Sequence, residues 1–173
     1  PVALNVNENT HTIPSEVVED ILARISASLS TINRYPDREF TALRTALANY
    51  LGHGLKPEQI WAANGSNEVI QQIFQAFGGP GRTSLGFGPT YSMYALIAQG
   101  TQTEYVDAPR ADRYVLTSEL AVEAVKKSKP DIVLLCSPNN PTGTPLDLEV
   151  ISAVYDATDG IVLVDEAYAE FAS

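Results

Sequence analysis

Apolar residues recur at helical spacing in the first third of the chain. They occupy positions 17, 18, 21, 22 and 25 of the segment 15–29, and positions 40, 43, 47 and 51 of the segment 40–51. Both patterns place the apolar residues on one face of an amphipathic helix. We therefore expect two helices, the first capped by Ser15 and the second ended at Gly52.

Further along the chain, short apolar runs alternate with longer helical patterns. Near-continuous apolar strands separated by helices are typical of a parallel sheet that helices cover on both faces. The expected fold is therefore α/β, in three α/β/α layers with a mostly parallel sheet, and ligands of such sheets bind at the carboxyl ends of the strands. The expected strands are 59–63, 83–87, 103–106, 132–136 and 161–165, and the expected helices are 65–77, a segment from Tyr91 to 99, 118–127 and 146–157.

Composition removes several classes of function. The 173 residues carry a formal net charge of −10 and are 45% hydrophobic, which provides a core and disfavours a nucleic acid or an anionic membrane as partner. No apolar run approaches the length of a membrane span, so we expect no membrane partner and a cytoplasmic location. The lone Cys136 excludes an internal disulfide, and His11 and His53 are isolated, so we expect no metal site.

One polar loop follows an expected strand and opens an expected helix. Its sequence is Gly65-Ser66-Asn67-Glu68. Free N–H groups in the first turn of a helix, together with the positive end of its dipole, bind anions and above all phosphate. The alternative is that Asn64 or Ser66 simply caps the helix, which is the interpretation that the tetrapeptide alone favours.

Two further polar segments follow the last two expected strands. Ser137–Gly143 carries two asparagines between prolines, which is either an ordinary turn or a rigid loop that presents an amide to a fixed acceptor. Asp165 ends an apolar strand, where a carboxylate needs a cationic partner, and Tyr168 follows three residues later. Pyridoxal 5'-phosphate needs this combination of groups. The carboxylate would pair with its cationic ring nitrogen, the Asn and the Tyr would donate to its oxyanion, and the helix N-terminus would bind its phosphate.

These motifs resemble those of a known family. They occur in the order and approximate spacing of the fold-type-I aminotransferases, which are pyridoxal-phosphate transferases, and the chain resembles most the histidinol-phosphate aminotransferases. The likeness extends over nearly the whole chain. The motifs that carry it are Leu4–Asn9, Tyr35–Asp37, Asn64–Glu68, Pro89–Tyr94, Ser137–Gly143 and Val164–Tyr168.

The resemblance implies roles around the cofactor ring. Asp165 would pair with the pyridine nitrogen, while Asn140 and Tyr168 would hydrogen-bond the phenolate oxygen. Tyr91 would stack on the ring. Without the resemblance, an aromatic residue at a helix start is as well explained by packing.

The resemblance also implies how the cofactor phosphate is held. The first-turn amides of Ser66 and Asn67 would bind it, and Tyr35 would reach the phosphate of the neighbouring subunit. A homodimer with a shared active site is therefore expected. Packing of an aromatic residue in a turn is the alternative for Tyr35.

Two departures from the family are visible. The aromatic residue that often follows the N-terminal Asn-Glu-Asn is replaced by Thr10-His11-Thr12. The lysine that forms the Schiff base in the family is expected beyond residue 173, so no catalytic residue is assigned within the chain. We expect residues 1–33 to be an N-terminal arm and first helix that belong with the small domain and the dimer contact, and residues 34–173 to be the first part of the large cofactor-binding domain, incomplete here.

The resemblance implies a reaction of histidine biosynthesis. Histidinol phosphate and 2-oxoglutarate would be interconverted with imidazole-acetol phosphate and glutamate. The alternatives within the superfamily are an aromatic amino-acid aminotransferase and a related decarboxylase. An alternative of another class is a non-catalytic module that binds a phosphate-bearing ligand or a partner chain.

Overall fold

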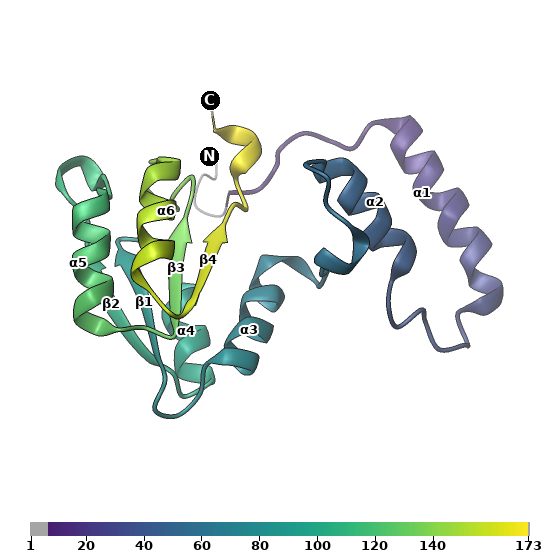
Figure 1. Ribbon diagram of the computed structural model, residues 1–173. Helices are drawn as coiled ribbons and strands as arrows, with labels where there is room; N and C mark the ends of the chain where they lie inside the picture. Colours follow the sequence, from purple (N-terminus) through teal and green to yellow (C-terminus); the bar gives the residue numbers. More distant parts are fainter. Residues whose placement is uncertain (1–6, 173) are drawn as a thin grey trace. The chain divides into compact units, whose positions relative to one another are not determined.

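The computed structural model describes residues 7–172 and divides into two units, Pro1–Ile60 and Trp61–Ser173 (Figure 1). Residues 4–6 of the Leu4–Asn9 motif lie outside the described residues. The boundary between the two units falls after Ile60, and the expected division of the chain after residue 33 stays a prediction. The expected association of residues 1–33 with a small domain and a dimer contact stays a prediction.

The first unit contains both expected helices. They are α1 (Ser15–Ser28) and α2 (Thr41–Leu51), and the short 3-10 turns η1 (Leu29–Thr31) and η2 (Pro57–Gln59) follow them. The apolar stripe of α1 faces solvent, because none of its residues is buried. In α2 the guanidinium of Arg44 donates to the carbonyl of Pro57 (2.8 Å) and thereby ties the helix to η2.

The caps of these two helices differ from the expectation. Ser15 is the first helical residue of α1, and Pro14 takes the cap position without a side-chain hydrogen bond, so the predicted cap is wrong. Proline suits this place because its fixed φ is compatible with the residues that precede a helix. At α2, Asp37 accepts from the N–H groups of Glu39 (3.0 Å) and Thr41 (2.9 Å).

The expected strand at 59–63 is also wrong. Residues 57–59 form the 3-10 turn η2, and residues 60–63 are neither helix nor strand. Pro57 opens the turn, and the side chain of Gln59 accepts from the N–H of Lys56 (3.0 Å). The indole of Trp61 then donates to Gln72, so an aromatic residue that suits a strand instead packs beside a helix.

The second unit contains the sheet and the helices that cover it. Its short 3-10 turns are η3 (Asp112–Tyr114) and η4 (Ala169–Phe171). The strands are β1 (Thr83–Gly88), β2 (Glu104–Pro109), β3 (Ile132–Cys136) and β4 (Ile161–Asp165), and the helices are α3 (Gly65–Phe77), α4 (Met93–Gly100), α5 (Ser118–Ser128) and α6 (Leu148–Ala157).

The four strands form one parallel sheet in the order β2-β1-β3-β4. Cys136 of β3 lies opposite Asp165 of β4, and Gly88 of β1 lies opposite Pro109 of β2. The carboxyl ends of β3 and β4 therefore lie side by side, and so do those of β1 and β2. This is the edge at which a parallel sheet binds ligands.

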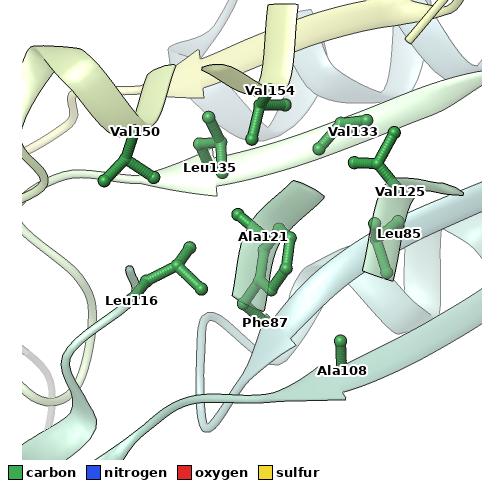
Figure 2. Close-up of a cluster of buried hydrophobic side chains, with 10 residues drawn as sticks. All are labelled: Leu85, Phe87, Ala108, Leu116, Ala121, Val125, Val133, Leu135, Val150 and Val154. Carbon is green, nitrogen blue, oxygen red and sulfur yellow. The ribbon is translucent and has the colours of Figure 1, made fainter. Parts of the chain in front are cut away.

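Side chains of β3 alternate between the two faces of the sheet. Val133 and Leu135 pack with residues of α5 and α6, whereas Ile132, Leu134 and Cys136 pack with residues of α3 and α4. All five are at most 3% exposed. Helices thus cover both faces, and the expected three-layer α/β/α fold is confirmed. Figure 2 shows the first of these clusters, formed by Leu85, Phe87, Ala108, Leu116, Ala121, Val125, Val133, Leu135, Val150 and Val154.

The outer strand β4 is less covered than β3. Residues 161–164 are half-buried, and only Asp165, at the carboxyl end, is buried. Within the described residues, no helix is both long and apolar enough to cross a membrane.

Candidate functional site

Two of the polar loops meet at the carboxyl ends of β3 and β4. The loop 137–143 begins where β3 ends, and its Ser137 N–H donates to the carbonyl of Asp165 (2.9 Å). Ser137 also binds the segment that follows the loop, because its hydroxyl accepts from the N–H of Leu146 (3.0 Å). The loop is therefore fixed directly beside the carboxylate that the sequence singled out.

Asp165 is a buried carboxylate, 7% exposed. Its Oδ2 accepts from the hydroxyl of Tyr94 (2.7 Å), and its Oδ1 accepts from the N–H of Ala167 (3.1 Å). Within the described part of the chain it has no ion-pair partner. Burying a carboxylate without a cation is costly, so this site is suited to a ligand that brings a cationic N–H.

The alternation of side chains between the two faces of the sheet explains why Asp165 contacts Tyr94. Asp165 lies opposite Cys136, whose side chain points toward α3 and α4. Paired residues of a parallel sheet point to the same face. Glu166, the next residue, is exposed, so the two adjacent carboxylates do not form an acid/base pair.

Asn139 holds the loop 137–143 in shape. Its side chain is 2% exposed. Both the oxygen and the nitrogen of its amide have hydrogen-bond partners. Oδ1 accepts from Thr90 Oγ1 (2.8 Å) and Arg110 Nη2 (3.0 Å), while Nδ2 donates to the carbonyl of Pro89 (3.0 Å) and to Thr142 Oγ1 (2.7 Å). We call these five residues the Asn139 network. It joins the loops that follow β1, β2 and β3.

Arg110 is the charged member of the Asn139 network. Besides Asn139 it binds two backbone carbonyls, with Nε donating to Phe87 (2.8 Å) and Nη1 to Tyr114 (3.3 Å). Burial lowers the pKa of this guanidinium from its ordinary value, although an arginine stays charged at any working pH. The side chain thus fixes the end of β1 to the loop after β3.

A hollow of about 430 Å³ lies beside Arg110. It is formed by residues 88–89 and 109–114, at the ends of β1 and β2. None of the residues predicted to bind a cofactor lines it. The hollow is therefore a different place from the Asp165 site.

Asn140 differs from its neighbour Asn139. It is half-buried, and no hydrogen bond of its side chain is found among the described residues. Its amide is therefore available to a ligand, as its predicted role requires. Tyr168 is also half-buried and immediately precedes η4. The predicted roles of both residues toward a phenolate oxygen stay predictions.

The amino end of α3 carries the expected anion site. Asn64 occupies the cap position without a side-chain hydrogen bond, and Ser66 lies inside the helix, so neither residue caps it. Ser66 and Asn67 are exposed. The carboxylate of Glu68 accepts from the N–H of Asn64 (2.6 Å). Since capping by a side chain is absent here, the first-turn amides remain available for an anion.

The helix α3 is anchored on the same face of the sheet as Asp165. Ile70 and Phe74 of α3 share a buried cluster with Tyr94 and Cys136. The carboxyl ends of the strands and the amino end of α3 therefore belong to one packed body. This is the arrangement that a ligand with a cationic ring and a phosphate needs.

The two predicted tyrosines have different surroundings. Tyr91 is half-buried and packs edge-to-face with Tyr94, with ring centroids 5.5 Å apart and an interplanar angle of 88°. Tyr35 lies in the first unit and is fully exposed. Tyr91 thus contacts Tyr94, which in turn donates a hydrogen bond to Asp165. The role of Tyr35 stays a prediction.

Four residues of this region were not singled out from the sequence. They are Thr90, Tyr94, Arg110 and Asn139. Asn139, Thr90 and Tyr94 lie within motifs that the sequence did single out, so their position was a usable signal. Tyr94 follows Tyr91 by three residues, which is one helical turn. Arg110 has no local signal, because its contacts lie 23 and 29 positions away.

Comparison with known proteins identifies the family. Residues 1–173 match the sequence pattern of the family described as aminotransferase class I and II. The chain belongs to this aminotransferase family. Two similar curated relatives are histidinol-phosphate aminotransferases, from Paenarthrobacter aurescens (62% identical over 175 residues) and Thermobifida fusca (55% over 168 residues). The alignments cover 99% and 97% of this chain but 47% and 46% of those relatives. The chain therefore spans about half the length of these members of the family.

Solved structures of aminotransferases share the fold. A putative histidinol-phosphate aminotransferase from Erwinia carotovora atroseptica superposes with a TM-score of 0.80 at 28% identity, covering 100% of this chain and 49% of that one. The Sinorhizobium meliloti histidinol-phosphate aminotransferase, in complex with pyridoxal-5'-phosphate, gives a TM-score of 0.76 at 26% identity, covering 88% and 41%. The expected fold type I is thus confirmed.

Proposed function

We propose that the whole protein, of which this chain corresponds to about half the length of its relatives, is a pyridoxal-phosphate-dependent histidinol-phosphate aminotransferase. It interconverts histidinol phosphate and 2-oxoglutarate with imidazole-acetol phosphate and glutamate. Family membership and curated relatives of that name at 48% to 62% identity support the proposal.

The buried carboxylate of Asp165 carries the proposal. It is 7% exposed and receives hydrogen bonds from Tyr94 and Ala167, but it has no ion-pair partner in the described part of the chain. A protonated pyridine nitrogen supplies the missing cation and one N–H donor. The residues present therefore fit pyridoxal 5'-phosphate.

Other residues of the chain account for the rest of the cofactor. The amides of Ser66 and Asn67 at the amino end of α3 bind its phosphate, and Tyr91 stacks on its ring. Asn140 and Tyr168 donate to its phenolate oxygen. These backbone amides and side chains come from the start of α3 and from the segments that follow β1, β3 and β4, which belong to one packed unit.

When bound, the cofactor supplies an electron-withdrawing ring to the carbon that loses or gains the amino group. This chain's part is to bind and orient it. Asp165 holds the ring nitrogen, and the Asn139 network keeps the loop with Asn140 in one shape. The loops also exclude water from the carboxylate, which strengthens its interaction with a cation.

The proposal includes a cytoplasmic homodimer. Tyr35 is fully exposed in the first unit, and α1 presents exposed apolar residues that a second subunit would cover. Tyr35 then reaches the cofactor phosphate of the neighbouring subunit.

Amino transfer by the whole protein tests this function. The purified protein is mixed with pyridoxal phosphate and glutamate, and the visible absorbance of the cofactor is followed together with 2-oxoglutarate release. We expect an absorbance change and faster turnover of histidinol phosphate than of phenylalanine. A preference for phenylalanine would favour an aromatic aminotransferase, and the absence of any absorbance change would contradict the proposal.

Asp165→Asn and a matched control variant, Asp159→Asn, test the role of the buried carboxylate. The first variant keeps the size of the side chain but removes the charge that the ring nitrogen needs, so we expect turnover to fall roughly a hundredfold or more. Asp159→Asn, at an exposed position just before β4, is the control and should leave turnover unchanged. Equal turnover by both variants would remove Asp165 from the proposed site.

A further inference from the structure

Tyr94 is completely buried although it carries a polar hydroxyl. It lies in the first turn of α4, is 0% exposed, and donates to Oδ2 of Asp165 at 2.7 Å, across 71 positions of sequence. A buried phenol needs a hydrogen-bond partner, and here the partner is the carboxylate proposed to bind the ring nitrogen. The contact is therefore more than core packing.

Both oxygens of that carboxylate are fixed by donors from this chain. Tyr94 holds Oδ2 from α4, and the N–H of Ala167 holds Oδ1 from the segment after β4 (3.1 Å). Two donors from two different elements leave the carboxylate one orientation, with lone pairs still available for a third donor. The direction in which Asp165 can bind a ligand is thus set before the ligand arrives.

The ring of Tyr94 contacts a second residue of the proposed site. Its edge-to-face contact with Tyr91 has a centroid distance of 5.5 Å and an angle of 88°. Such a pair has a preferred geometry, so a shift of Tyr94 moves Tyr91 as well. One buried side chain therefore supports both the carboxylate proposed to bind the ring nitrogen and the aromatic ring proposed to stack on the cofactor.

Tyr94 keeps its proton throughout the working pH range. Burial raises its pKa far above that of a free phenol, and the hydrogen bond to Asp165 raises it further. The hydroxyl is consequently a donor and never a competing anion beside the carboxylate.

We propose that Tyr94 is a positioning residue: its hydroxyl orients Asp165 toward the cationic ring nitrogen of the cofactor, and its ring supports Tyr91. The inference rests on the proposed function, because it needs pyridoxal phosphate as the ligand. It assigns to Tyr94 no contact with the cofactor.

The test compares two ligands that differ only at the ring nitrogen. The first is pyridoxamine 5'-phosphate, which cannot bond covalently to a lysine, and the second is its analogue with carbon in place of that nitrogen. Dissociation constants are measured by fluorescence titration of the whole protein and its variants. The ratio of the two constants reports how well Asp165 recognises the nitrogen.

Tyr94→Phe removes one hydroxyl and keeps the ring. We expect it to weaken binding of pyridoxamine phosphate roughly tenfold, the size of one lost hydrogen bond to a charged group, while binding of the carbon analogue stays the same. The control is Tyr105→Phe, which removes a hydroxyl from a tyrosine packed against the same cluster. It should leave both constants unchanged.

The inference is overturned if the ratio of the two dissociation constants is the same in Tyr94→Phe as in the parent protein. That result includes an equal loss of affinity for both ligands, which would mean that Tyr94 contributes packing alone. If Tyr94→Phe does not fold, 3,5-difluorotyrosine at position 94 keeps the shape and changes only the donor strength, and an unchanged ratio then has the same meaning. A parent protein that binds neither ligand, or that does not distinguish them, instead refutes the proposed function.

Discussion

Adjacent asparagines in the loop 137–143 should respond to truncation in opposite ways. Asn139 is 2% exposed and makes four side-chain hydrogen bonds, whereas the half-buried Asn140 makes none among the described residues. Asn139→Ala therefore removes a structural support, and Asn140→Ala removes only a proposed ligand contact. The two variants differ by one position and by nothing else in chemistry.

The expected loss of stability follows from the partners of Asn139. A hydrogen bond between neutral groups contributes about 1 kcal/mol and one to a charged group about 1.5–3 kcal/mol, and Arg110 is the charged partner. Three bonds of the first kind and one of the second amount to about 5 kcal/mol. Water that enters the vacated space recovers part of it, so we expect Asn139→Ala to lose about 3–4 kcal/mol of the free energy of unfolding.

The measurement is urea unfolding of the chain at low concentration, followed by circular dichroism. With a slope of about 2 kcal/mol per molar urea, the midpoint of Asn139→Ala should fall by roughly 1.5–2 M. Asn140→Ala should stay within about 0.5 kcal/mol of the parent chain. Equal midpoints for the two variants, or a larger loss in Asn140→Ala, would refute the assignment of the Asn139 network.

An isosteric variant separates the acceptor from the donor side of Asn139. Asn139→Asp keeps the oxygen that accepts from Thr90 and Arg110, but it loses the donor to the carbonyl of Pro89 and places a second oxygen against it. Attraction to Arg110 offsets part of that repulsion. We expect a midpoint between those of Asn139→Ala and the parent chain, and a midpoint below that of Asn139→Ala would contradict this account.

Three further predictions concern the body of the sheet. Phe87→Ala, at a side chain 1% exposed in the cluster of Figure 2, should cost about 3–5 kcal/mol and lower the melting temperature. Gly86→Ala places a Cβ against the hydroxyl end of Tyr105, and the cost of about 1–3 kcal/mol should shrink in a Tyr105→Leu background, as measured by urea unfolding. Burial raises the pKa of Asp131, but hydrogen bonds from the Thr83 N–H and Arg82 outweigh it and lower the pKa. The ionised carboxylate of Asp131 therefore contributes to the free energy of unfolding above the ordinary carboxyl pKa of about 4, and this contribution is lost as the pH falls below that value. Asp131→Asn should consequently lose less of its free energy of unfolding over the same acidic pH range.

The secondary structure of the second unit was best predictable where a strand is apolar without interruption, as in β3. The expected strand 132–136 coincides with β3, whose side chains are buried on both faces, so tertiary packing and local pattern favour the same result. Residues 59–63 also look strand-like, but among the residues that the structure describes no strand pairs with them, and Pro57 starts a 3-10 turn instead. Local pattern cannot indicate whether a partner strand is present.

The site was predictable in its motifs but not in the division of roles within them. Sequence shows two asparagines in the loop, and only the hydrogen bonds reveal that Asn139 faces the protein. Tyr94 looks like an ordinary core residue of an apolar helix until its hydroxyl is found beside Asp165. Arg110 is recognisable only in three dimensions, because it joins the end of β1 to a loop that lies 29 positions further on.

The order of the strands also determines how the chain behaves in solution. The β2 edge carries Glu104, Asp107 and Pro109, which discourage the addition of another strand, whereas the β4 edge presents Ile161–Val164 without a charge. Within the described residues, no strand pairs with that second edge. It is therefore a template for another extended segment, so concentrated samples of the chain should associate through β4 in addition to the proposed dimer contact.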